Sequence, residues 1–120
     1  MEIFDFYKTS GIDMSEHNGG QFYALKRSDA LEMVDLLNDA GVTIHSIDVV
    51  HRSISGIYDY RNETGERICW DFDSENIPDG ERYGVSKMRI EALGLENVAF
   101  LFSDEKSYKA WKKNHQRMSA

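Results

Sequence analysis

The side chains that could do chemistry concentrate in one acidic stretch, CWDFDSENIPDGE, at residues 69–81. Asp71, Asp73 and Glu75 occupy every second position, as the first ligands of a calcium-binding loop do. Such a loop also needs glycine at its sixth position and glutamate at its twelfth, where this chain has Asn76 and Arg82. We therefore predict no calcium site. No glycine-rich phosphate cradle accompanies the carboxylates, so we expect neither a metal nor a cofactor.

The single cysteine is a poor candidate for a nucleophile. Cys69 is predicted to face Asp59 across two paired strands, with no histidine nearby in the sequence. A neighbouring carboxylate disfavours the thiolate that nucleophilic catalysis requires. A lone cysteine also excludes an intrachain disulfide and a four-cysteine zinc site.

The four histidines give no specific signal. His45 and His51 lie six residues apart in or next to one predicted strand and could share a face of it, but a metal would need further ligands. His17 lies in a loop that contains glycine, and His115 lies in a predicted helix. No nucleophile elbow, HExxH, CxxC or P-loop pattern occurs. We therefore expect a protein that is not an enzyme.

The positive signal is the combination of carboxylates with aromatic rings. At an interface, rings bury apolar area and carboxylates pair with lysine or arginine of a partner. The opposing interpretation places the rings in the core and the acidic residues on its solvated face, and we favour it for Tyr60 and Trp70. The carboxylates that we expect to contact a partner are Asp59, Asp71, Asp73, Glu75, Asp79 and Glu81.

The overall charge favours a basic protein as that partner. The chain of 120 residues carries 21 acidic against 14 basic side chains, which gives a formal charge of −7. Such a surface disfavours direct binding to nucleic acid and speeds encounter with a basic protein, although it also serves solubility. No apolar run approaches the ~20 residues of a membrane span, and MEIFDFYK lacks the pattern of a signal peptide. We therefore expect a cytoplasmic protein.

A β-hairpin over residues 57–73 is predicted to position the acidic stretch. Its turn, Asn62-Glu63-Thr64-Gly65, fits a type I turn followed by a glycine in the left-handed region. That turn sets the register of the two strands, and the side chains of the paired residues then share one face. The predicted pairs are Tyr60 with Ile68, Tyr58 with Trp70, and Gly56 with Phe72.

The first half of the chain is predicted to hold three strands and a helix. Residues 2–7 alternate in the manner of a strand, and residues 21–26 follow as a second strand that pairs with it across a long loop. Ser28 is predicted to cap a helix that Gly41 ends, and residues 42–50 form a β-branched strand. The buried stripe of the helix is expected to comprise Leu31, Val34 and Leu37, with Ala30 and Met33 beside it.

The second half adds one strand and two helices. Residues 85–93 fit both a helix and a strand, and we favour the helix. Residues 97–102 are apolar on both faces, as a central strand is. Ser103 is predicted to cap a last helix. Together the elements predict a single α+β domain over residues 1–120, with an antiparallel or mixed sheet of about five or six strands and two or three helices on one face.

In size, acidity, α+β character and the run CWDFDSENIPDGE, the chain resembles the immunity proteins of bacterial polymorphic-toxin and contact-dependent inhibition systems. The resemblance implies tight one-to-one binding of a cognate toxin domain, at its active site or on a nearby surface. The carboxylates of the inhibitor would mimic the phosphates of a nuclease substrate. The resemblance assigns no individual functional residue.

Two other functions fit the sequence. One is a small-molecule-binding or enzymatic domain, with a pocket of Tyr58, Tyr60 and Trp70 and with His45 or His51 as acid or base. The other is a phage-encoded inhibitor of a nucleic-acid-binding defence enzyme. It relies on the same acidic mimicry, so the sequence does not separate it from the immunity protein.

Overall fold

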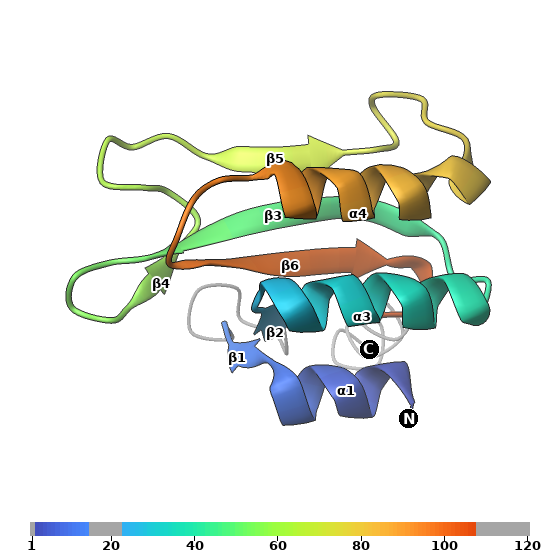
Figure 1. Ribbon diagram of the computed structural model, residues 1–120, viewed down its shortest axis with the longest axis horizontal. Helices are drawn as coiled ribbons and strands as arrows, with labels where there is room; N and C mark the ends of the chain where they lie inside the picture. Colours follow the sequence, from blue (N-terminus) through green and yellow to red (C-terminus); the bar gives the residue numbers. More distant parts are fainter. Residues whose placement is uncertain (1, 15–22, 108–120) are drawn as a thin grey trace, which may run out of the picture.

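A computed structural model describes residues 2–14 and 23–107, and its strands form one antiparallel sheet (Figure 1). The strands are β1 (Ile12–Asp13), β2 (Tyr23–Leu25), β3 (Ile44–Arg52), β4 (Tyr58–Asp59), β5 (Ile68–Asp71) and β6 (Val98–Asp104). Their order is β1-β2-β6-β3, and the far edge of β3 pairs with both β5 and β4. The helices are α1 (Ile3–Ser10), α3 (Arg27–Asp39) and α4 (Arg82–Ala92), with a 3-10 turn η1 (Asp79–Glu81) before α4. The predicted α+β class is confirmed.

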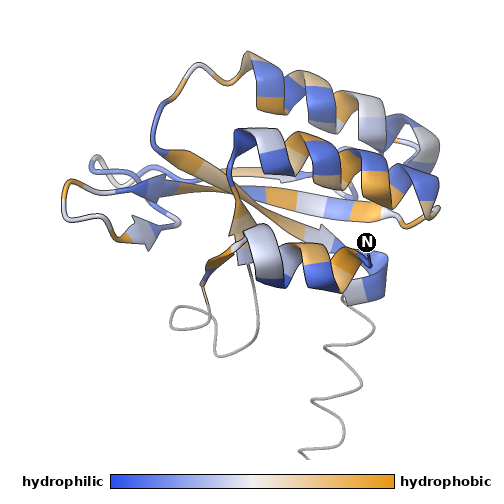
Figure 2. Cartoon of the chain, turned by 60° about the horizontal axis from the view of Figure 1, so that its bottom comes forward, coloured by the Kyte–Doolittle hydropathy of each residue, from blue (hydrophilic) through white to orange (hydrophobic). Residues whose placement is uncertain are grey.

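The α-helices α1, α3 and α4 of the described residues pack against one core on the same face of the sheet (Figures 1 and 2). Helix α3 lies between α1 and α4 and contributes four buried residues at helical spacing, Ala30, Met33, Val34 and Leu37. Burial of each of the larger apolar side chains contributes roughly 1.5–3 kcal/mol. The sheet supplies the other half of this core, which includes Ile44, Ile47, Val49, Phe100 and Phe102. No helix among residues 2–14 and 23–107 has the length and apolarity to cross a bilayer.

Helix α3 ends just before Gly41, as predicted, and it begins earlier than the predicted cap Ser28. Gly41 has a φ of +65° and donates its N–H to the carbonyl of Asn38, while the N–H of Val42 reaches back to Leu37 over 2.9 Å. This pair of bonds is a Schellman motif. The cap position at the start is Lys26, not Ser28, because β2 continues to Leu25 and leaves a single connecting residue.

Residues 2–7 form most of helix α1 rather than the predicted strand. Ile3, Phe6 and Tyr7 are buried with helical spacing, and Phe4 is 46% exposed. The hydroxyl of Tyr7 donates a 2.9 Å hydrogen bond to the buried carboxylate of Asp104, which ties the helix to the end of β6. The predicted hairpin with residues 21–26 is therefore wrong. The second strand is present as β2, and it pairs with β1 and β6.

The turn of the predicted 57–73 hairpin is confirmed, but most of its pairing is not. Gly65 has a φ of +83°, Asn62 donates to the carbonyl of Glu66, and Arg61 bridges to Arg67 as the register requires. Beyond this bridge the two strands separate, and each pairs with β3. The observed pairs include Trp70 with Ile47, Ile68 with Val49, and Tyr58 with Arg52.

The predicted aromatic face is divided by this pairing. Ile68, Trp70 and Phe72 belong to the core beneath the helices. Tyr58 and Tyr60 pack instead against a second cluster that contains Met14, Ala24, Val50, Ala99 and Leu101. The prediction of a shared face was wrong because a free edge of β3 competes for both strands.

The last part of the chain follows the prediction more closely. The helix favoured for residues 85–93 is α4, and β6 is the central strand, between β2 and β3. Ser103 lies within β6 and does not cap a helix. Asp104 takes that role, since its carboxylate accepts bonds from the N–H and the hydroxyl of Ser107. His17 and His115 lie outside the described residues.

Two glycine substitutions test the packing of this fold in opposite directions. A Cβ on Gly11 would overlap the carbonyl oxygen of Tyr7 and the side chain of Tyr23, whereas a Cβ on Gly84, inside α4, meets nothing within 4 Å. We expect Gly11→Ala to lower the free energy of unfolding by about 1–3 kcal/mol and Gly84→Ala to raise it by about 0.5–1 kcal/mol. Urea unfolding followed by circular dichroism measures both. Equal effects of the two substitutions would contradict the packing of α1 against β2.

Candidate functional site

The acidic loop between β5 and α4 is built around a buried arginine. The Arg82 side chain is only 7% exposed. It donates to the carbonyls of Ile77 and Ile44 over 2.7 and 2.9 Å, and to the Asp73 carboxylate over 2.6 Å. A buried guanidinium is tolerated when its donors are satisfied in this way. Arg82 therefore anchors the loop to the first residue of β3.

Three carboxylates of the loop are engaged by neighbouring side chains. Asp71 accepts bonds from the N–H and hydroxyl of Ser74, which lower its pKa. The bond from Arg82 holds the pKa of Asp73 below its usual range. Arg89 of α4 grips Glu75 with two bonds of 2.7 and 2.8 Å and lowers its pKa as well. All three carboxylates are therefore ionised at neutral pH.

The remaining predicted carboxylates differ in position. Asp79 is 69% exposed, accepts a bond from Thr43 and lies 3.7 Å from the Arg82 guanidinium. Glu81 is exposed in the 3-10 turn. The structure thus brings five of the six predicted residues into one loop. The sixth, Asp59, lies in β4 at the other end of β3 (Figure 1).

His45 connects this loop to the end of β6. Its Nδ1 lies 2.9 Å from Asp73, and its Nε2 lies 2.5 Å from Glu105. Only the imidazolium donates from both ring nitrogens, so this geometry favours the charged ring. Partial burial lowers the pKa of His45, but the bonds to Glu105 and Asp73 outweigh it and the pKa is raised. His51 lies at the opposite end of β3, so the two histidines do not form one site.

The loop carboxylates are not arranged as a cation site. Asp71, Asp73 and Glu75 are directed to Ser74, Arg82 and Arg89. Across the two described segments, no group of three or more histidine, cysteine, aspartate or glutamate side chains is placed to hold a metal ion.

Cys69 has a different neighbour from the one predicted. It pairs with Asp48 of β3 and not with Asp59. Partial desolvation of the thiol, followed by the charge of Asp48, raises the pKa of Cys69 to about 11. The thiolate is therefore scarce at neutral pH, which argues against a nucleophilic role.

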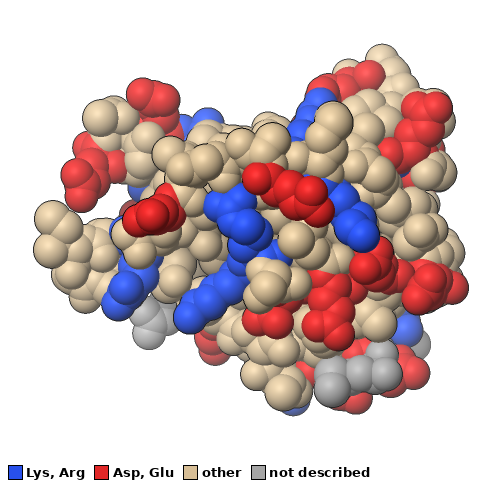
Figure 3. All heavy atoms as spheres, viewed as in Figure 1, with Lys and Arg blue, Asp and Glu red and all other residues tan. Residues whose placement is uncertain are grey.

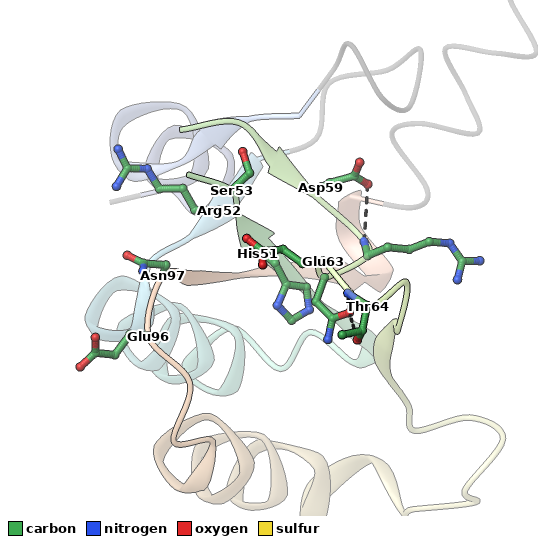
Figure 4. A pocket seen from close by; sticks show the side chains of 10 residues that line it. His51, Arg52, Ser53, Asp59, Glu63, Thr64, Glu96 and Asn97 are labelled. Carbon is green, nitrogen blue, oxygen red and sulfur yellow. Dashed lines mark hydrogen bonds between the residues drawn. The ribbon is translucent and has the colours of Figure 1, made fainter. Parts of the chain in front are cut away.

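A hollow of about 440 Å³ lies at the end of β3 that pairs with β4 (Figure 4). His51 lines it, and its buried Nε2 has no hydrogen-bond partner among the described residues. The predicted pocket of Tyr58, Tyr60 and Trp70 is not formed, since Trp70 stacks near Phe100 on the helix side of the sheet. The residues around the hollow are His51, Arg52, Ser53, Asp59, Arg61, Asn62, Glu63, Thr64, Glu96 and Asn97.

Sequence reasoning located the acidic loop but missed the residues that hold it. Arg82 entered only as the wrong residue for a calcium loop, although an arginine beside five carboxylates is itself a signal of ion pairing. Arg89, Thr43 and Glu105 lie too far away in the sequence to be recognised as partners. Comparison of the chain with protein-family models, curated proteins and solved structures gave no match.

Removing the arginine anchor should unfold the loop. Arg82→Met leaves the carbonyls of Ile44 and Ile77 without a donor, and we expect it to lower the free energy of unfolding by about 2–4 kcal/mol. The matched control is Lys87→Met, which removes a half-exposed ion pair with Asp35 and should cost less than about 1 kcal/mol. Urea denaturation measures both variants. A cost for Arg82→Met as small as that of the control would show that the anchor is not needed.

The His45 bridge should make stability depend on pH. Since its pKa is raised on folding, the stabilisation is complete below the unfolded value of 6.5 and is lost as pH rises through the higher folded pKa. His45→Gln should remove this decline, whereas His51→Gln should leave it in place. Denaturant unfolding at a series of pH values between 5 and 9, together with an NMR titration of the His45 ring, checks the direction. The bridge would be contradicted if the free energy of unfolding of the wild type rose with pH over this range and that of His45→Gln did not.

Proposed function

We propose that this chain is an immunity or inhibitor protein that binds a basic partner, a nuclease toxin domain, through the acidic loop at residues 71–81. The observation that carries the proposal is that two of the loop's carboxylates, Asp73 and Glu75, are ionised and fixed in place by a buried and a half-buried arginine. A toxin that degrades nucleic acid acts inside the cell, so the proposal places the inhibitor in the cytoplasm.

The fixed loop lowers the entropy that binding must overcome. Arg82 holds Asp73 from below, and Arg89 holds Glu75 through two parallel bonds. A surface that is ordered before encounter loses less conformational freedom when a partner docks. The carboxylates stay accessible, with side-chain exposures of 54% for Asp73 and 41% for Glu75.

The loop also keeps a net negative charge after its internal ion pairs are counted. The five loop carboxylates together with Glu105 carry six negative charges, against three positive charges on Arg82, Arg89 and the His45 imidazolium, so a net charge of about −3 remains. On the helix side of the molecule, lysine and arginine side chains lie among acidic side chains over α3 and α4, and further acidic side chains lie at the upper right, where Figure 1 shows the loop before α4 (Figure 3). The field of the loop would steer a basic cleft toward this end of the molecule.

The aromatic side chains that the sequence placed beside the acidic residues are not available for an interface. Phe72 is fully buried beneath the Arg89 guanidinium, and Trp70 is half-buried in the core. The proposal therefore rests on carboxylates alone, and the apolar contribution would come from exposed Pro78 and half-buried Ile77 beside them. The small-molecule alternative is not carried forward, since its aromatic pocket is not formed.

Charge reversal at the outer carboxylates tests the proposal. Asp79→Lys with Glu81→Lys changes two exposed residues and spares Asp73, whose loss would release Arg82. We expect this double variant to lose at least 100-fold in affinity for the basic protein that tagged wild type retains from the lysate of the source cell. The matched control reverses the same charges on helices, at Glu32 and Glu91, and should retain that protein.

Three readouts give the result its meaning. Retention that falls with salt for wild type indicates charge pairing. Growth rescue on co-expression of the captured protein with this chain would establish neutralisation, and the captured protein's identity separates a toxin from a nucleic-acid-binding defence enzyme. Equal retention by the loop and control variants would exclude the loop as the contact surface.

A further inference from the structure

An apolar tip projects from the end of the molecule opposite the acidic loop. The β3–β4 hairpin carries Ile54, which is 98% exposed, and Ile57, which is 61% exposed. Hydrogen bonds fix the turn: Ser53 donates its N–H to the Ile57 carbonyl over 2.8 Å, and Gly56 donates to Ser53 over 2.9 Å. Exposure of two isoleucine side chains to water is unfavourable, and an interface would bury them.

The hollow at the base of this hairpin contains unpaired charges of both signs. Arg52, Asp59, Glu63 and Glu96 form no ion pair with any described residue, in contrast to Asp73 and Glu75 of the acidic loop. The buried Nε2 of His51 has no hydrogen-bond partner there either.

Two of the unpaired charges, Arg52 and Asp59, are placed on opposite sides of the hollow. Figure 4 shows Arg52, Glu96 and Asn97 on one side and Asp59 and Thr64 on the other, with His51 and Glu63 between them. A two-fold axis through the hollow would bring the Arg52 side of one copy onto the Asp59 side of its partner. Each ion pair would then form twice, as an isologous contact requires.

We propose that this patch, which comprises the hairpin tip and the lining of the hollow, is the interface of a homodimer. Ile54 and Ile57 supply its apolar contact, and Arg52 of each copy pairs with Asp59 of the other. The lining has three carboxylates and two arginines. It is therefore close to neutral on a chain of charge −7, so two copies repel each other only weakly when they meet here. The acidic loop remains open in such a dimer.

The first test is the oligomeric state of the full chain. Light scattering after size exclusion should give a mass that rises from 13.8 kDa toward twice that value as the concentration increases to about 1 mM. Ile54→Asp should lower the association constant at least tenfold, whereas Met88→Asp, an equally polar change at an exposed site on α4, should not change it. A monomer throughout this range, or a dimer insensitive to Ile54→Asp, overturns the proposal.

A charge exchange tests the arrangement of the two copies. Arg52→Glu places like charges against Asp59 in a homodimer, and Asp59→Arg places like charges against Arg52. Each variant should be monomeric alone, and an equimolar mixture of the two should form a mixed dimer in which both pairs are restored. Native mass spectrometry distinguishes the mixed dimer by mass. Failure of the mixture to dimerise, when wild type does, overturns the assigned pairing of Arg52 with Asp59.

Discussion

The long strand β3 is the constraint on which the rest of the structure depends. Its nine residues pair with β6 along one edge and with β5 and then β4 along the other. Every backbone group that a central strand buries needs a partner, so these pairings fix where the neighbouring segments lie. At the start of β3, the carbonyl of Ile44 accepts a hydrogen bond from Arg82. At its end, His51 and Arg52 border the hollow. One strand therefore sets the separation between the acidic loop and the hairpin tip.

The sequence correctly predicted the elements whose geometry is determined by one residue or by a few adjacent residues. Gly41 and Gly65 occupy the left-handed positions that their turns require, and the apolar residues of the run at 97–102 lie in the central strand β6. Residues 2–7 could not be assigned in this way, because Ile3, Phe6 and Tyr7 fit a helix as well as Phe4 and Phe6 fit a strand. A bond between Tyr7 and a residue 97 positions away selects the helix.

The hairpin shows the same limit at the level of pairing. The turn at Asn62 closes as its residues dictate, but whether the flanking strands stay together depends on what else can pair with them. The edge of β3 offers Ile47 and Val49 to Trp70 and Ile68, and it places these side chains in the core beneath the helices. The positions of the loop carboxylates were predictable from spacing. Their engagement by Arg82, Arg89 and His45 was not, because each partner is fixed by tertiary packing.

The position of β6 in the sheet has a consequence for how the chain can fold during its synthesis. β2 and β3 share no hydrogen bonds; β6, which follows both in the chain, lies between them and pairs with each. Until residues 98–104 have left the ribosome, no strand joins β1 and β2 to the part of the sheet formed by β3, β4 and β5. Helix α1 also lacks its hydrogen bond to Asp104 until then. Such late, long-range closure delays completion of the sheet until β6 has been synthesised, and the edges of β2 and β3 stay open to other chains until then.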